Sequence, residues 1–193
     1  MSAGEELTSE EFLKSIGERF RALKRDAEKA IVQLADDQLH VALDENTNSA
    51  AVIMKHMAGN LRSRFTDFLT TDGDKPNRNR DGEFIDDHAP RAAVLTDWES
   101  GWRTLFDALA SLRPEDLTKT ITIRGEAHTV IDALHRALAH QGYHVGQITQ
   151  LARFLAKDQW QTITIPRGGS EAFNRGKRAD QQARQPTQGR EVP

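Results

Sequence analysis

The amino-acid sequence predicts an all-α protein, a four-helix bundle that carries one small β-hairpin. Four long segments repeat apolar residues at steps of three and four, which is the period of an amphipathic helix. One short segment instead alternates β-branched residues and then reaches a glycine, as a hairpin does. A long stretch without periodicity separates the second and third helices. Such a connection allows two consecutive helices to run parallel within a bundle.

The first two helices are expected at about residues 9–34 and 48–69. Ser9 is a suitable start for the first helix because its hydroxyl can cap free backbone N–H groups. The second helix is expected to stop at the turn-forming run Thr70-Thr71-Asp72-Gly73. The two apolar stripes comprise Phe12, Ile16, Phe20, Leu23, Ala27, Ile31 and Leu34 in the first helix, and Ile53, Met57, Leu61, Phe65 and Phe68 in the second.

The second half of the bundle follows a crossover over residues 72–89, which is rich in Asp, Asn, Gly and Pro. The third helix should begin near Pro90, a residue suited to a first helical turn, and its Trp98 and Trp102 are expected in the core. The remaining elements are expected at residues 118–129 (a hairpin around Gly125) and 129–156 (the fourth helix).

Beyond Ile165 the composition changes, because large apolar residues become rare. We therefore expect a bundle domain over residues 1–165 and a largely flexible C-terminal extension over residues 166–193. Disorder is expected from Gln181 onward.

Composition limits the classes of function that the chain can have. The formal net charge of the 193 residues is −3, which does not indicate a nucleic-acid-binding protein. There is no cysteine, so a metal site would have to use His, Asp, Glu or water. No apolar run approaches the roughly 18 residues of a membrane span, and the N-terminus lacks a signal pattern. We expect a cytoplasmic protein without a membrane partner.

A candidate metal site lies in the fourth predicted helix. His140 and His144 are four residues apart, so their side chains lie on one helix face, one turn apart, and could share one metal ion. A third ligand has to come from another helix, and His56 is the best candidate. Because His56 lies about 120° from the centre of its apolar stripe, we expect the site at the rim of the bundle. His40 and His135 are expected to face solvent.

The spaced histidines belong to a wider pattern. It comprises His56-Met57-Ala58-Gly59-Asn60-Leu61, the segment Phe68 to Pro76 with its Asp-Gly-x-Lys-Pro run, Arg78-Asn79-Arg80-Asp81 with Glu83-Phe84, and His140 to Gln147. With these residues the chain resembles the DinB/YfiT-like metalloproteins over roughly residues 8 to 175. It is most similar to a DinB-like branch described as a domain of unknown function.

The resemblance implies a bundle with up-down-down-up connectivity, often dimeric. It also implies a divalent metal, commonly nickel or zinc, held by the positions that match His56, His140 and His144. Relatives in the superfamily include thiol S-transferases that use low-molecular-weight thiols. From this resemblance we expect a small-molecule substrate. We also expect a homodimer, because two-fold dimers are the commonest oligomers of soluble proteins.

Three neutral imidazoles would leave one coordination position open, as in catalytic zinc sites. Our first hypothesis is a metal-dependent enzyme in which the metal activates a low-molecular-weight thiol, with hydrolysis by activated water as the nearest alternative. The second hypothesis is a non-catalytic, stress-associated bundle in which the metal is structural or vestigial. A cavity open to solvent above the histidines would favour the enzyme, whereas a site capped by apolar side chains would favour the second hypothesis.

Four further residues are candidates for binding the substrate or a thiol cofactor. Arg78 and Arg80 could bind a carboxylate or phosphate, although a solvated loop is an equally good interpretation. Asn60 could hydrogen-bond a metal ligand, but it could also be an ordinary polar residue on the flank of the helix. Tyr143 could orient a substrate, although packing in the core or at an interface is the simpler expectation.

Overall fold

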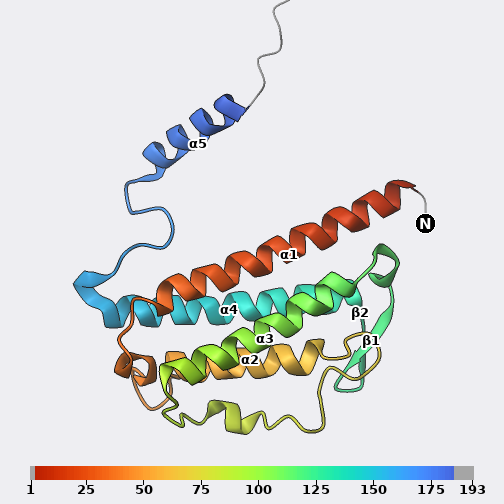
Figure 1. Cartoon of the computed structure of the whole chain (residues 1–193), viewed down its shortest axis with the longest axis horizontal. Helices are drawn as coiled ribbons and strands as arrows, with labels where there is room; N and C mark the ends of the chain where they lie inside the picture. Colours follow the sequence, from red (N-terminus) through yellow and green to blue (C-terminus); the bar gives the residue numbers. More distant parts are fainter. Residues whose placement is uncertain (1–2, 185–193) are drawn as a thin grey trace, which may run out of the picture. The chain divides into compact units, whose positions relative to one another are not determined.

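The computed structural model describes residues 3–184, and it is mostly helical. Within this range it contains five α-helices and one two-stranded antiparallel sheet (Figure 1). The helices are α1 (Ala3–Ile31), α2 (Ala50–Phe65), α3 (Arg91–Ser111), α4 (Val130–Ala156) and α5 (Ser170–Arg184). The strands are β1 (Thr120–Ile123) and β2 (Glu126–Thr129), and the short 3₁₀ helices are η1 (Asp37–His40), η2 (Asp81–Phe84), η3 (Pro114–Asp116) and η4 (Lys157–Gln159). The predicted helical class and the hairpin are confirmed.

Local capping decides where two of the helices begin. The hydroxyl of Ser49 accepts a hydrogen bond from the backbone of Val52, so α2 begins after Ser49. Thr129 accepts from the backbone of Asp132 in the same way and caps α4. At α1 the prediction is wrong at both ends, because this helix starts six residues before Ser9 and ends at Ile31.

The chain divides into two compact units near Trp160. The first unit contains α1 to α4 and the hairpin. The second unit contains α5, a helix that the sequence analysis did not expect. The predicted disorder from Gln181 is wrong for residues 181–184, which lie in α5, and its remainder falls outside the described residues. The predicted domain boundary at residue 165 and the flexibility of the extension stay predictions.

Four long helices pack pairwise in the first unit. The main contacts join α2 to α3 and α1 to α4, and further contacts join α2 to α4 and α1 to α3. In Figure 1, α2 and α3 run in one direction, whereas α1 and α4 run in the other. Close packing of α2 on α3 requires glycine at Gly101, because a Cβ there would overlap the backbone of Ala58. Because α2 and α3 run in the same direction, the segment between them is a long crossover, which returns the chain to the end at which α2 begins.

The core contains the two tryptophans of α3, Trp98 and Trp102, both with no exposed surface, as predicted. Helix α2 is buried on more than its apolar stripe, because η2 packs against it in addition to α3 and α4. His56 is consequently only 4% exposed. The expectation of a site at the rim of the bundle is wrong for this residue, since the crossover covers the side of α2 that helical periodicity left open.

The crossover is tied to the hairpin at one end. Asp72 accepts hydrogen bonds from the backbone of Arg124 (2.9 Å) and Gly125 (2.8 Å), the two residues of the hairpin turn. These backbone donors, with that of Gly125 first, hold the pKa of Asp72 far below its ordinary value. Gly73 adds a backbone bond to Thr122 at 2.8 Å. The start of the crossover is thus fixed beside the strands.

Among the described residues, no helix combines the length and the apolar character that crossing a membrane requires.

Candidate metal centre

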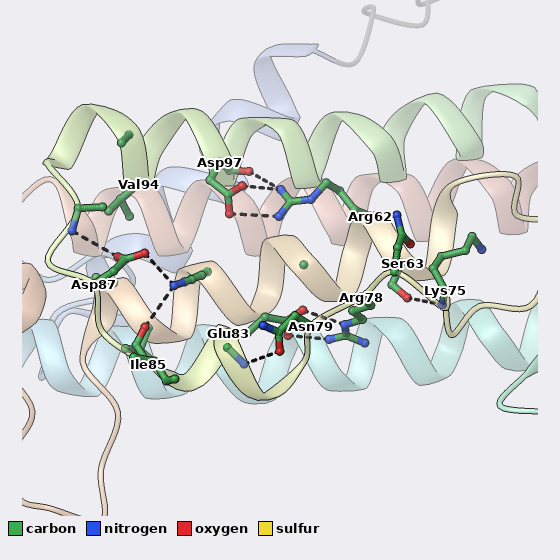
Figure 2. Close-up of a pocket in the computed structure, with 18 of the residues that line it drawn as sticks. Arg62, Ser63, Lys75, Arg78, Asn79, Glu83, Ile85, Asp87, Val94 and Asp97 are labelled. Carbon is green, nitrogen blue, oxygen red and sulfur yellow. Dashed lines mark hydrogen bonds and ion pairs between the residues drawn. The ribbon is translucent and has the colours of Figure 1, made fainter.

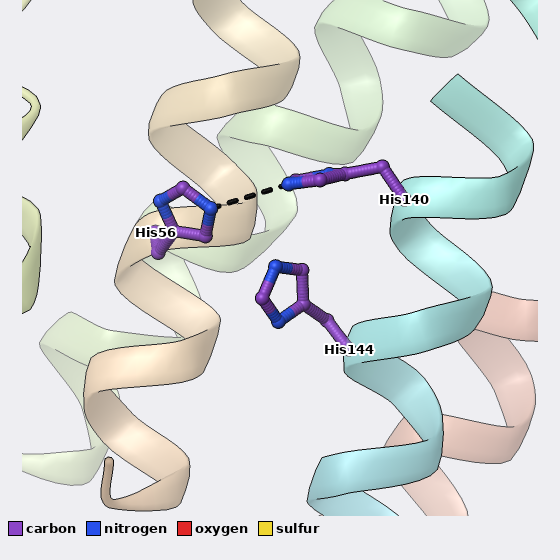
Figure 3. A group of neighbouring side chains, drawn as sticks. All are labelled: His56, His140 and His144. Carbon is purple, nitrogen blue, oxygen red and sulfur yellow. Dashed lines mark hydrogen bonds between the residues drawn. The ribbon is translucent and has the colours of Figure 1, made fainter. Parts of the chain in front are cut away.

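Three histidines from two helices converge inside the first unit (Figure 3). His56 comes from α2, and His140 and His144 come from adjacent turns of α4. One ring nitrogen of each lies within 4.8 Å of those of the other two, which is close enough to hold one metal ion. The structure thus brings together the three residues that the sequence singled out, and their role as ligands stays a prediction.

The distance between the two closest ring nitrogens fits a shared ion. Nε2 of His56 lies 3.3 Å from Nε2 of His140. Two nitrogens bound to one tetrahedral zinc ion at about 2.0–2.1 Å would lie roughly 3.3–3.4 Å apart. The donor set, three imidazoles and no thiolate, suits zinc, nickel or copper.

Glu83, in η2, orients His56. One carboxylate oxygen of Glu83 lies 2.9 Å from Nδ1 of His56. Arg78 holds the same carboxylate through two hydrogen bonds of 2.8 Å each. Burial alone would raise the pKa of Glu83, but the hydrogen bonds from Arg78 and His56 outweigh it and lower the pKa. An ionised Glu83 accepts a hydrogen bond from Nδ1–H of His56, which leaves the Nε2 lone pair free for a metal.

Two neighbours make room for this contact and cover it. A Cβ at position 59 would overlap the carboxylate of Glu83, so Gly59, one turn from His56, is required for its approach. Phe84 packs its ring against the ring of His56, with 4.5 Å between the centroids. The 3₁₀ helix η2 therefore both orients His56 and shields it from water on one side.

Glutamines accompany the other two histidines. Nδ1 of His144 lies 2.7 Å from the side-chain oxygen of Gln147, and that glutamine also donates to the hydroxyl of Tyr143 at 3.2 Å. Nδ1 of His140 lies 3.3 Å from the amide nitrogen of Gln141, whose oxygen is buried without a hydrogen-bond partner. Half a turn of the Gln141 amide would let this oxygen accept from Nδ1–H of His140, the tautomer that frees Nε2.

Two of the histidines in α4, His140 and His144, are neutral at physiological pH. Burial is the largest cause that lowers the pKa of His140 to about 3, followed by the nearby His144 and His56 and then by two arginines. Burial is likewise the first cause that lowers the pKa of His144. Neutral imidazole is the form that binds metals, so metal binding by these two residues would not require the removal of a proton.

A cavity of about 260 Å³ opens beside His56 and His140. Three of the four predicted substrate-binding residues line it: Asn60, Arg78 and Arg80. Tyr143 does not, and this residue is 65% exposed, so the expectation of core packing is wrong for Tyr143. The tyrosine lies one position before His144 on α4 and points away from the core. Its packing at an interface, the other expectation, stays a prediction.

A larger groove of about 860 Å³ lies between α2, α3 and the crossover (Figure 2). Its charged residues are largely paired with each other: Lys55 with Asp87 at 2.9 Å and Arg62 with Asp97 at 2.7 Å. None of the three histidines lines it. Glu83 contributes to its wall and so separates this groove from His56.

A second group of possible ligands comprises His40, Asp86 and His88. The side chain of His40 is only 14% exposed, so its predicted solvent-facing position is wrong. It is buried because both ring nitrogens are hydrogen-bonded, Nδ1 to Asp86 at 2.7 Å and Nε2 to the carbonyl of Ala89 at 3.1 Å. This contact fastens the end of the crossover to η1.

Sequence reasoning missed several residues of the centre. Glu83 had no predicted role, since nothing in a non-periodic loop indicates that it reaches a helix 27 residues away. Gly59 was an available signal, because a glycine within the buried part of a helix often permits a close approach. Other residues at the centre or its cavity that were not predicted are Arg64, Arg124, Arg136, Gln141 and Gln147.

Comparison with protein families adds one finding. A family model described as "Protein of unknown function (DUF1572)" matches residues 7–169, which is most of the chain. The chain belongs to this family. DUF1572 is a DinB-like family of unknown function, so the DinB-like resemblance is confirmed at that level and no more specific activity follows from it. No significant match was found among curated proteins or solved structures.

Proposed function

We propose that this DUF1572 protein is a metal-dependent enzyme with a three-histidine centre. One observation carries the proposal: the ring nitrogens of His56, His140 and His144 converge within 4.8 Å beside a cavity that reaches two of them. A ligand set of three histidines leaves a coordination position for a reactant, which is the arrangement of catalytic sites.

The residues of the chain prepare this site in three ways. Glu83 and Arg78 fix the tautomer and ring orientation of His56. Burial keeps His140 neutral, so its nitrogen is available at physiological pH. Phe84 excludes water from one side of His56, so a reactant has to enter from the side of the cavity.

We infer that the reactant is a low-molecular-weight thiol and that the reaction is its transfer to an electrophilic small molecule. A bound zinc or nickel ion would lower the pKa of a thiol and stabilise its anion. Hydrolysis is the alternative reaction, because water could occupy the same position. We interpret α1 to α4 as a DinB-type four-helix bundle with up-down-down-up connectivity, and we expect a cytoplasmic homodimer without a nucleic-acid partner.

A non-catalytic role is the second candidate, and the packing of Phe84 on His56 favours it. The cavity beside His140 weighs against it, because a purely structural site has no need of one. A catalytic role requires the cavity as the place where a reactant enters, whereas a non-catalytic role does not require it.

The test is a screen of thiols with an electrophilic acceptor, on tag-free protein loaded with zinc or with nickel. We expect turnover in the native protein, turnover at the background rate in His140→Ala, and full turnover in His135→Ala. His135 is an exposed residue of the same helix, so the second variant controls for the loss of any imidazole from α4. Full activity in a metal-free His140→Ala protein would overturn the proposal.

A further inference from the structure

The cavity beside His56 and His140 has a one-sided charge. Five of its thirteen lining residues are arginines, and none is Asp or Glu. The arginines are Arg64, Arg78, Arg80, Arg124 and Arg136. They come from α2, the crossover, the hairpin turn and α4. The chain as a whole has a net charge of −3, so this concentration of cations does not follow from a basic composition.

Carboxylates nearby neutralise only part of this charge. Asp74 lies 3.3 Å from both Arg64 and Arg124, and Glu83 is held by Arg78. Asp81, which is almost fully exposed, lies 3.9 Å from Arg80. Arg136 has no hydrogen bond or ion pair among the described residues. Four of the five arginines thus share three carboxylates, none of which lines the cavity.

Arg78 keeps an unused donor in this environment. Its side chain is 6% exposed, and its Nη1 is buried without a hydrogen-bond partner, since the nearest carboxylate oxygen, that of Asp74, is 3.9 Å away. A buried guanidinium nitrogen without an acceptor costs free energy, so an acceptor supplied by a ligand would be favourable. Guanidinium groups bind carboxylate and phosphate oxygens through paired, charge-assisted hydrogen bonds.

Apart from His56, Asn60 and His140, the rest of the lining is apolar. Phe65, Phe68 and Ile123 are buried core residues that reach the cavity, and Ala133 and Ala137 of α4 leave space in it. A volume of about 260 Å³ admits a small molecule but not a nucleic-acid strand or a protein segment. The lining therefore fits a small organic anion with an apolar part.

We propose that this arginine-lined cavity binds the oxyanion of a small substrate, a carboxylate or a phosphate, and holds its reactive part beside His56 and His140. The position beside the histidines rests on the proposed function. The binding of the anion does not, because it depends on the arginines alone.

The experiment is calorimetric titration of metal-free and zinc-loaded protein with phenylacetate, phenyl phosphate and benzyl alcohol. These probes share an apolar ring and differ in charge, so the first two distinguish a carboxylate from a phosphate. We expect at least one anion to bind metal-free protein about tenfold or more tightly than benzyl alcohol. The anion that binds more tightly identifies the group.

A double variant, Arg80→Gln with Arg136→Gln, tests the cavity. Neither arginine holds Glu83 or Asp74, so both substitutions leave the hydrogen bonds that support His56 in place, and, of the contacts around His56, Arg80→Gln removes only that of Arg80 with the ring of Phe84. We expect it to weaken anion binding about tenfold or more. The matched control is Arg103→Gln with Arg153→Gln, which removes exposed arginines of α3 and α4 outside the cavity, and here we expect a change of at most about twofold.

The outcomes separate the two proposals. Equal affinity for benzyl alcohol, or equal anion binding in the Arg80/Arg136 variant, would overturn the anion site even if the protein still takes up metal. Anion binding that responds to the arginines in a protein without metal affinity would support the anion site and contradict the proposed function. Anion binding only in zinc-loaded protein, unchanged by the Arg80/Arg136 variant, would assign the anion to the metal and overturn the arginine-lined cavity.

Discussion

Two groups of potential metal ligands occur in this chain, and they use their ring nitrogens differently. In the first, His56 keeps one nitrogen for Glu83 and directs the other toward His140. In the second, His40 uses one nitrogen for Asp86 and the other for the carbonyl of Ala89. Both groups bring three possible ligand atoms within 4.8 Å of one another. Proximity is therefore the same in both, and the difference lies in which atoms remain available.

The second group is better explained as a structural contact. Asp86 also accepts from the hydroxyl of Ser49 at 2.7 Å and from the backbone of His88 at 2.9 Å. Five residues from three segments are thus joined by four hydrogen bonds. A metal ion bound by His40 would have to break existing hydrogen bonds of this residue. A metal ion bound by His56 would instead lie between Nε2 of His56 and Nε2 of His140, which already approach each other.

The largest expected difference between the groups concerns metal affinity. Replacement of His56 by alanine removes one of three ligands, and we expect the affinity for zinc to fall by more than about a hundredfold, since even the loss of a group behind a ligand costs 10–100-fold. His40→Ala should leave it within about twofold. Competition with a chromophoric chelator measures both, and loss of affinity in His40→Ala would remove the distinction between the groups.

The carboxylates behind the histidines offer a second, smaller contrast. Glu83→Gln keeps the shape of the side chain but removes its charge, so we expect zinc affinity to fall by about 10–100-fold. Asp86→Asn, the same change in the second group, should not alter it. Chelator competition is again the measurement. Equal effects of the two substitutions would contradict an orienting role of Glu83.

Stability should show the opposite ranking in metal-free protein. His40→Ala removes one partner of Asp86 and the side-chain partner of the Ala89 carbonyl, both of which are partly buried, and we expect a loss of about 1–3 kcal/mol in the free energy of unfolding. His140→Ala should change it by less than about 1 kcal/mol, because His140 has only one weak hydrogen bond outside the cluster. Urea unfolding with chelator present would decide, and a larger loss in His140→Ala would be evidence against the comparison.

The pH dependence of metal-free stability gives the smallest effect. The pKa of His140 falls from 6.5 in the unfolded chain to about 3 in the folded protein. The unfolded state therefore binds more protons between these values, and stability is complete above pH 6.5 and declines as the pH falls toward 3. The slope from this residue is at most about 1.4 kcal/mol per pH unit.

His140→Ala should reduce this decline, which can be read from unfolding curves at pH 7.5 and pH 5.5. His88→Ala is the control from the second group, because His88 is largely exposed. Identical pH slopes in the native protein and His140→Ala would show that His140 is not held neutral by the fold.

Periodicity was sufficient to predict α1 to α4 but not α5, and the convergence of α2 with α4 was predicted from the bundle class together with the DinB-like resemblance. The apolar stripes determine which helix faces turn inward, and His140 with His144 share such a face. The spacing of residues also predicted the hairpin around Gly125. In the structure this glycine lies in the hairpin turn and adopts a positive φ of 76°.

The environment of the candidate site could not be predicted in the same way. Burial of His56 depends on Glu83 and Phe84, whose segment has no repeat that would reveal its position against α2. The arginine-lined cavity gathers residues from four segments, and no spacing in the sequence connects Arg64 with Arg136. Long-range side-chain contacts of this kind arise only when the crossover is placed, and the sequence contains no local rule for that placement.

Native mass spectrometry of tag-free protein, after exposure to zinc and removal of excess ion, tests the central claim most directly. The account predicts one tightly held ion per chain in the native protein and in His40→Ala, and none in His140→Ala. A native protein that retains no ion, or a His140→Ala protein that retains one, would contradict it.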